Sequence, residues 1–293
     1  MLQEALSLSE AETDPVLTGH VLNELGVVAH NKGDYEGAAA RAHRALELLR
    51  PPGDRRGLAT ALNLLGLVAH HRREFDAAQE YLTETLELAR AIADRRSVAV
   101  ALNNLGSIAL YREDYERAWA LFHEALAIQR KLQNRRSVAN LLSNLGDTAR
   151  GLRQQVLAKE MHRQALTERA AMKDRPGVAT SLLNLAYVAV ATGELERAAV
   201  LLAAGDRVRS DVGVALPASG QEEFDRHLSA VRAGLGQRFA EAWARGCAMT
   251  PEEAVAYALE DGREEDADTS WTTAGSSRAG SGDSGAADSA PLR

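Results

Sequence analysis

Residues 94–133 read DRRSVAVALNNLGSIALYREDYERAWALFHEALAIQRKLQ. Asp94 is a favourable N-cap, and the apolar residues after it recur at spacings of three and four, which places them on one face of an α-helix. Glu113 and Asp114 then supply a turn and a second cap, after which the same apolar spacing returns. The two apolar sets are Val98, Leu102, Leu105 and Ala109, and then Ala118, Phe122 and Leu126. We therefore expect a hairpin of two helices.

The same forty-residue pattern occurs five times in one register. Its clearest columns are a Leu-Gly pair (Leu-Ala in the last copy), an alanine, and a capping Asp or Asn. These columns are Leu25-Gly26, Leu65-Gly66, Leu105-Gly106, Leu145-Gly146 and Leu185-Ala186; Ala38, Ala78, Ala118, Ala158 and Ala198; and Asp14, Asp54, Asp94, Asn134 and Asp174. A constant period of this length indicates stacked units that cannot bury their apolar faces alone. We predict an all-α protein, a solenoid with five hairpins over residues 12–211.

Two features of the units concern packing. A glycine inside a helix costs roughly 1 kcal/mol relative to alanine, so Gly106 requires a compensating close approach, which we expect against the alanine column. The aromatic residues after the turn are expected to fill the gap between neighbouring hairpins; they are Tyr35, Phe75 and Tyr115. The fourth unit has Gly151–Gln155 in place of the acidic turn and the aromatic residue. We expect it to be the least stable unit, through either a hinge or sequence drift.

Each unit resembles the tetratricopeptide repeat. The resemblance rests on the Leu-Gly pair in the first helix, an aromatic residue after the turn (as in Gly33-Asp34-Tyr35-Glu36), and an alanine twelve residues beyond the glycine. The usual unit has about 34 residues, so the forty-residue unit of this chain is similar to longer variants with extended helices. The resemblance covers about residues 14–211. It implies a right-handed α-solenoid that binds a protein or a peptide.

The resemblance also implies a binding groove on the first helices. In such arrays these helices line the concave surface, and asparagines beside the Leu-Gly pair often hold a peptide backbone or a carboxylate. The residues in matching places are Asn23, Asn63, Asn103, Asn104, Asn144 and Asn184, followed one turn later by His30, His70, Tyr111 and Arg150, with Asp147 between. An amide offers a donor and an acceptor together, which suits an extended peptide. Alternatively, such asparagines hydrogen-bond the neighbouring helix, and both interpretations stay open.

The two ends of the chain depart from the period. Residues 1–11 match the columns of a second helix, with Leu2 on the column of Leu82, so we expect a truncated repeat there. This favours a chain that is the C-terminal part of a longer protein or has a mis-assigned start. Residues 212–261 are predicted to form capping helices, and residues 262–293, rich in Ser, Gly and Asp, a disordered tail. Two capping boxes are expected before these helices, Ser219 with Glu222 and Thr250 with Glu253.

Residues 195–260 resemble the C-terminus of large bacterial regulators. The matching segments are AAVLLAAG (198–205), Leu216-Pro217, FAEAWARG (239–246) and TPEEAVAYAL (250–259). In those regulators a DNA-binding or signalling domain and an ATPase precede the array. The resemblance implies a sensor or autoinhibitory role, relayed to an upstream ATPase or DNA-binding domain. The alternatives are a stand-alone scaffold, a peptide-pheromone sensor, or the recruitment part of an enzyme whose catalytic domain is absent.

Composition argues against several other functions. The net charge of −7 comes entirely from residues 252–268, and the rest of the chain has no basic surplus for binding nucleic acid. Cys247 is the only cysteine, and no apolar run is long enough to span a membrane, so we expect a cytoplasmic protein. His30 and His70 share a column but lack a third ligand, so no metal or cofactor is predicted. No phosphate-binding loop or nucleophile elbow has a suitable setting, and no enzyme activity is expected.

Overall fold

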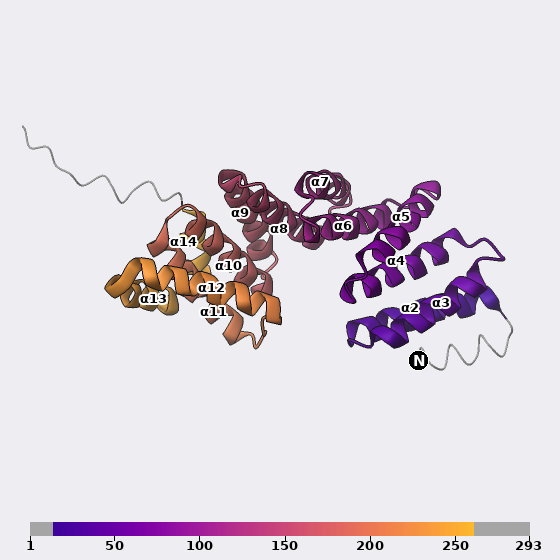
Figure 1. Cartoon of the computed structure of the whole chain (residues 1–293), viewed down its shortest axis with the longest axis horizontal. Coiled ribbons are helices and arrows are strands. Elements are labelled where there is room, and N and C mark those ends of the chain that lie inside the picture. The colour runs from indigo at the N-terminus through magenta and orange to yellow at the C-terminus, as the bar shows by residue number, and fades with distance from the viewer. Residues whose placement is uncertain (1–13, 261–293) are drawn as a thin grey trace, which may run out of the picture. The chain divides into compact units, whose positions relative to one another are not determined.

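The computed structural model describes residues 14–260, and within this range every regular element is a helix (Figure 1). The first helices of the hairpins are α2 (Pro15–Asn31), α4 (Arg55–His71), α6 (Arg95–Tyr111), α8 (Arg135–Gly151) and α10 (Arg175–Ala191). The second helices are α3 (Tyr35–Leu49), α5 (Phe75–Ala91), α7 (Tyr115–Lys131), α9 (Gln155–Ala171) and α11 (Leu195–Asp211). Each first helix begins 40 residues after the preceding one. The predicted α-solenoid of helical hairpins is confirmed.

The predicted caps begin all five first helices. The Asp94 carboxylate accepts hydrogen bonds from the backbone N–H groups of Arg96 at 3.1 Å and Ser97 at 3.2 Å. Burial opposes ionisation of Asp94, but these bonds outweigh it and lower the pKa of the carboxyl. The same capping contact is made by Asp14, Asp54, Asn134 and Asp174. Because the first turn of a helix has no internal acceptors for its N–H groups, each cap fixes where a hairpin starts.

The glycine within the first helix of the second, third and fourth hairpins makes room for a large side chain of the second helix. A Cβ atom at Gly106 would lie 2.7 Å from the Phe122 ring, and one at Gly66 would lie 2.6 Å from Leu82. We expected these glycines to lie closest to the alanine column of the second helix, and this is wrong for Gly66 and Gly106. The position four residues further along the second helix fills the space beside each glycine, because a side chain pointing back toward the helix N-terminus covers the preceding turn.

The aromatic residues after the turns fill the gaps between hairpins, as predicted. Tyr35 stacks on His71 with 4.7 Å between ring centroids, and Phe75 packs on Tyr111 at 5.2 Å. Tyr115 lies against Gly151, where a Cβ atom would overlap its ring. The unusual glycine of the fourth unit therefore has a packing role. The helices of that unit, α8 and α9, have the same length as those of the unit before it.

Three further helices and a short 3-10 turn follow the array. They are α12 (Ala218–Leu235), η1 (Gly236–Arg238), α13 (Phe239–Ala248) and α14 (Pro251–Leu259). Phe224 and Val231 of α12 are buried in one apolar cluster with residues of α10 and α11. Such burial is what closes the open end of a repeat array.

The two predicted capping boxes have different outcomes. The box at Ser219 is wrong, because α12 begins at Ala218 after Pro217 and has no side-chain cap. The box at Thr250 is confirmed: the Glu253 N–H donates to Thr250 Oγ1 at 3.2 Å, and the Thr250 N–H donates to Glu253 Oε2 at 2.8 Å. The expected truncated repeat (residues 1–11) and the expected tail (residues 262–293) lie outside the described residues. In residues 14–260 no helix has both the length and the apolar character to cross a membrane.

Candidate functional site

Four asparagines connect the first helices of the second, third and fourth hairpins, and we call them the asparagine ladder. Asn104 Nδ2 of α6 donates to Asn63 Oδ1 of α4 at 2.9 Å. Asn144 Nδ2 of α8 donates to Asn103 Oδ1 of α6 at 3.1 Å, and Asn103 Nδ2 donates to Asn104 Oδ1 at 3.2 Å. The ladder has the contacts expected of a structural role. The Asn63 amide nitrogen and the Asn144 amide oxygen take no part in it, and both side chains are half-buried.

The two remaining asparagines differ from the ladder. Asn23 is 1% exposed, and its Nδ2 donates to the Gly57 carbonyl at 2.9 Å. A residue so buried is not accessible to a ligand, so the structure removes Asn23 from the predicted groove. Asn184 of α10 is half-buried and donates to Ser143 Oγ of α8 at 3.2 Å.

Aromatic rings and imidazoles gather where the first helices end. His30 lies 5.1 Å from the ring of His71, while His70 lies 5.9 Å from Phe75 and 5.8 Å from Tyr111. Burial, and then the charge of the neighbouring imidazole, lower the pKa of His70; the same two causes lower that of His71. Both shifts favour the neutral imidazole. Tyr111 is the exposed end of this group, with 52% of its surface accessible.

Arg150 lies beside Asp147 and contacts α12. Arg150 Nη2 is 3.0 Å from Glu223 Oε1 of α12 and 3.6 Å from Asp147 Oδ1. The Arg150 guanidinium also lies over the Tyr187 ring of α10, 5.5 Å from its centroid. Tyr187 in turn stacks on His227 of α12, with 4.2 Å between centroids. α12 thus packs beside α10 and α11 and meets the first-helix face at Arg150 of the fourth hairpin and Tyr187 of the fifth (Figure 1).

A buried histidine lies beneath this contact. His162 of α9 is 1% exposed, neither of its ring nitrogens has a hydrogen-bond partner, and Nε2 is 3.7 Å from Asp147 Oδ1. Burial, with the charges of Arg150 and Arg169, lowers the pKa of His162 to about 3. Although 30% of the Asp147 side chain is exposed, desolvation raises its pKa to about 6, opposed by Arg150.

Sequence reasoning missed His162, Tyr187, Glu223 and His227. Two of them carried a signal. His162 occupies the column of Leu82 and Phe122, where a polar residue is exceptional. Tyr187 follows Asp147 by one period. Glu223 and His227 lie beyond the repeats, so no column places them.

The arrangement offers hydrogen-bonding amides, a cation and aromatic rings, which are groups suited to binding. In the part of the chain that the structure describes, no three or more His, Cys, Asp or Glu side chains are arranged to hold a metal ion. Most of the residues that were predicted to line the groove lie in two regions of the first-helix face. One is the asparagine ladder with His70 and Tyr111, and the other is the contact with α12.

Comparisons with known proteins agree with this fold. A family model described as tetratricopeptide repeat matches residues 1–91 and 97–167. No curated protein matches the chain.

Several solved structures are similar in fold. BtubC from P. vanneervenii has 24% identity and a TM-score of 0.63, covering 74% of this chain and 89% of its own. A signal transduction ATPase with numerous domains and a tetratricopeptide repeat sensor, from Pyrococcus horikoshii, has 17% identity and a TM-score of 0.65 over 82% of this chain and 37% of its own. A Rap protein complexed with competence and sporulation factor has 14% identity and a TM-score of 0.59, covering 83% of this chain and 76% of its own. At these identities the likeness shows the fold alone.

Proposed function

Because the chain belongs to the tetratricopeptide repeat family, we propose that it is a non-catalytic module that binds a protein or peptide on the face of its first helices. The observation that carries this proposal is the position of α12. A helix from outside the repeats lies on this face and is held by the contacts of Glu223 with Arg150 and of His227 with Tyr187. The face is therefore suited to a helix that carries acidic and aromatic groups.

The second and third hairpins present the rest of this face. There the Asn63 amide nitrogen, which the ladder does not use, can donate to a peptide backbone. Tyr111 lies about two turns beyond Asn104 on α6. Tyr111 supplies a large ring of the kind that dominates the energetics of protein interfaces. We propose that a partner segment lies across Asn63, Asn104 and Tyr111, and that α12 limits its extent toward the fourth hairpin.

A photo-crosslinking amino acid at selected positions tests this proposal. One full-length variant carries it at Tyr111, and a matched variant carries it at Val156 of α9, which is 86% exposed on a second helix. We expect a partner in a cell extract to crosslink at position 111 and not at position 156. Equal crosslinking at both positions, or crosslinking at position 156 alone, would contradict the proposed face.

We further propose that the module is the sensor end of a bacterial signalling or transcription regulator, in contact with an ATPase or DNA-binding domain. The support is the resemblance of residues 195–260 to the C-terminus of such regulators. The alternatives are a stand-alone scaffold, a peptide-pheromone sensor or the recruitment part of an enzyme. Identification of the protein crosslinked at position 111 distinguishes them: an ATPase or DNA-binding partner supports the sensor role, and a short secreted peptide supports the pheromone sensor.

A further inference from the structure

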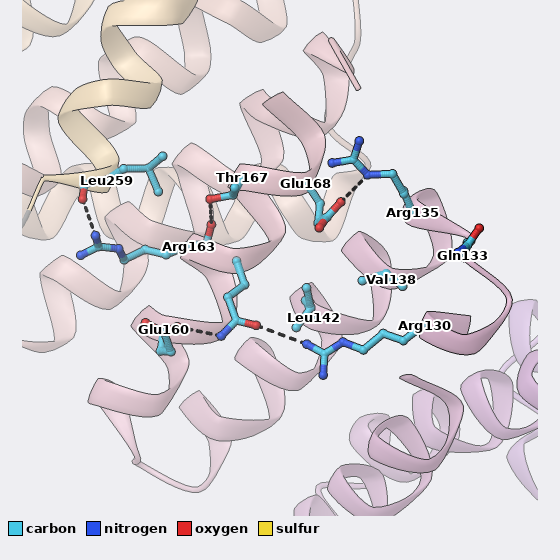
Figure 2. A pocket seen from close by; sticks show the side chains of 11 residues that line it. Arg130, Gln133, Arg135, Val138, Leu142, Glu160, Arg163, Thr167, Glu168 and Leu259 are labelled. Carbon is cyan, nitrogen blue, oxygen red and sulfur yellow. Dashed lines mark hydrogen bonds and ion pairs between the residues drawn. The ribbon is translucent and has the colours of Figure 1, made fainter. Parts of the chain in front are cut away.

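A pocket of about 850 Å³ lies between α7, α8 and α9, with Leu259 of α14 in its wall (Figure 2). Val138 and Leu142 of α8 form its floor and are only 8% and 2% exposed. The rim carries three arginines from three different helices; they are Arg130, Arg135 and Arg163. An apolar floor with a few convergent polar groups, in a cavity of this size, is typical of a ligand site.

The preceding repeat serves as an internal comparison for Arg130. One period earlier, Arg90 forms an ion pair with Glu124 at 2.9 Å. At the corresponding place, Arg130 donates to the neutral amide oxygen of Gln164 at 3.5 Å. The carboxylate that neutralises Arg90 is thus replaced by an amide, and the positive charge of Arg130 is retained.

The other polar groups on the rim do not replace this carboxylate. The Gln164 amide nitrogen donates to Glu160 at 2.7 Å, so Gln164 lies between Glu160 and Arg130. Glu168 pairs with Arg135 at 2.8 Å. Arg163 donates to the Leu259 carbonyl, which carries no net charge. Arg130 is therefore the cation on the rim with the weakest contact to a group of this chain.

We propose that this pocket, which we name the arginine pocket, binds a partner segment that has a carboxylate next to an aliphatic side chain. The carboxylate would take the place at Arg130 that Glu124 takes at Arg90. A guanidinium offers paired donors that match a carboxylate. The aliphatic side chain would lie against Leu259 and over the edge of Val138. This site is separate from the asparagine ladder and does not depend on the function proposed for it.

Fluorescence anisotropy with the full-length chain tests the arginine pocket. The probe is a short labelled peptide with Leu-Asp-Leu-Glu between glycine and serine residues, and its match has Leu-Asn-Leu-Gln. We expect the acidic peptide to bind at least about tenfold more tightly, with an affinity that falls as salt is added. Equal affinity for the two peptides, or no binding of the acidic one, would overturn the proposal.

The variant Gln164→Glu gives the sharper test. It places at Arg130 a carboxylate like the one found at Arg90, in exchange for the hydrogen bond to Glu160, so we expect about tenfold weaker binding of the acidic peptide with the fold retained. The matched control is Gln79→Glu, which adds the same charge beside Arg112 and outside the pocket, and which should bind the peptide as the wild type does. Wild-type affinity in Gln164→Glu, or a loss in the control, would contradict the assignment. A free peptide with the sequence of residues 260–268 is a third probe, and tighter binding of it would assign the pocket to that segment instead of a partner.

Discussion

Arg150 of α8 and Glu223 of α12 form an ion pair at 3.0 Å that joins residues 73 positions apart. The two side chains are 24% and 31% exposed, so water screens their interaction only in part. Through this pair a helix outside the repeats is fixed on the face of the first helices. The surrounding contacts with Asp147 and Tyr187 make single substitutions ambiguous, because each would disturb several groups at once.

A double-mutant cycle with Arg150→Gln and Glu223→Gln isolates the pair. We expect a coupling free energy of about 1 kcal/mol from urea unfolding, toward the upper end for partly exposed pairs. The control is Arg207 with Asp211, whose side chains are 54% and 49% exposed and whose coupling should be below about 0.5 kcal/mol. Equal coupling in the two cycles would show that α12 is not held by this pair.

Gly106→Ala should destabilise the protein although alanine is the better helix former. The added Cβ atom would lie 2.7 Å from the Phe122 ring, which is fully buried and cannot move aside freely. Overpacking of this kind costs about 1–3 kcal/mol, which exceeds the helix-propensity gain of about 1 kcal/mol. Thermal unfolding of Gly106→Ala and of the neighbouring Ser107→Ala measures the difference. A more stable Gly106→Ala would contradict the packing described for this glycine.

Ala93→Gly should stabilise the protein. Ala93 has a φ of 54°, in the left-handed region where a Cβ atom is unfavourable, whereas Gly53, one period earlier in the corresponding turn, has a φ of 72°. Relief of this strain, less the larger entropy of glycine in the unfolded chain, leaves a gain of about 0.5–1 kcal/mol. The reverse change, Gly53→Ala, is the control and should lose a similar amount in urea unfolding, since a Cβ atom there meets no other atom within 4 Å. A loss of stability in Ala93→Gly would refute the role of backbone strain.

His162 and Asp147 make opposite contributions to the pH dependence of stability. A histidine whose pKa is lowered on folding loses stability as pH falls below about 6.5, since only the unfolded chain then takes up the proton. A carboxyl whose pKa is raised, as in Asp147 at about 6, gains stability as pH falls from 6 toward 4. In this window the two effects oppose each other.

His162→Phe removes one of these effects and keeps the shape of the column, which has phenylalanine at Phe122. Between pH 7.5 and pH 5, the free energy of unfolding of the variant should rise by about 2 kcal/mol relative to that of the wild type. This is the free energy by which protonation of one histidine stabilises the unfolded wild type. Phe122→Leu removes no titratable group, so its destabilisation should be the same at both pH values. If the two proteins differed in unfolding free energy by the same amount at both pH values, His162 would take up its proton as readily in the folded protein as in the unfolded chain.

The array was predictable from the sequence because its determinants are local and repeated. Asp94 with its four counterparts fixes where helices begin, and the period fixes which residues share a face. The position of α12 was not predictable, because Glu223 has no counterpart in the repeats and reaches Arg150 only through tertiary packing. The glycine partner was misjudged for a similar reason: choosing Phe122 over Ala118 requires the side-chain direction as well as the spacing.

The roles of the asparagines illustrate the same limit. Residue type and column placed Asn23 and Asn103 in one set, yet Asn23 is 1% exposed and Asn103 is half-buried. The sequence pattern does not separate them, because burial at the start of the array depends on how Asn23 meets the Gly57 carbonyl of the next hairpin.

The affinity of the partner crosslinked at position 111 for the variant Asn104→Ala with Asn144→Ala tests the binding face most directly. If the asparagine ladder is part of the binding surface, the dissociation constant should rise about tenfold, while urea unfolding measures the separate loss of ladder hydrogen bonds. A lower stability with an unchanged dissociation constant would contradict a binding role and leave the asparagines as links between helices.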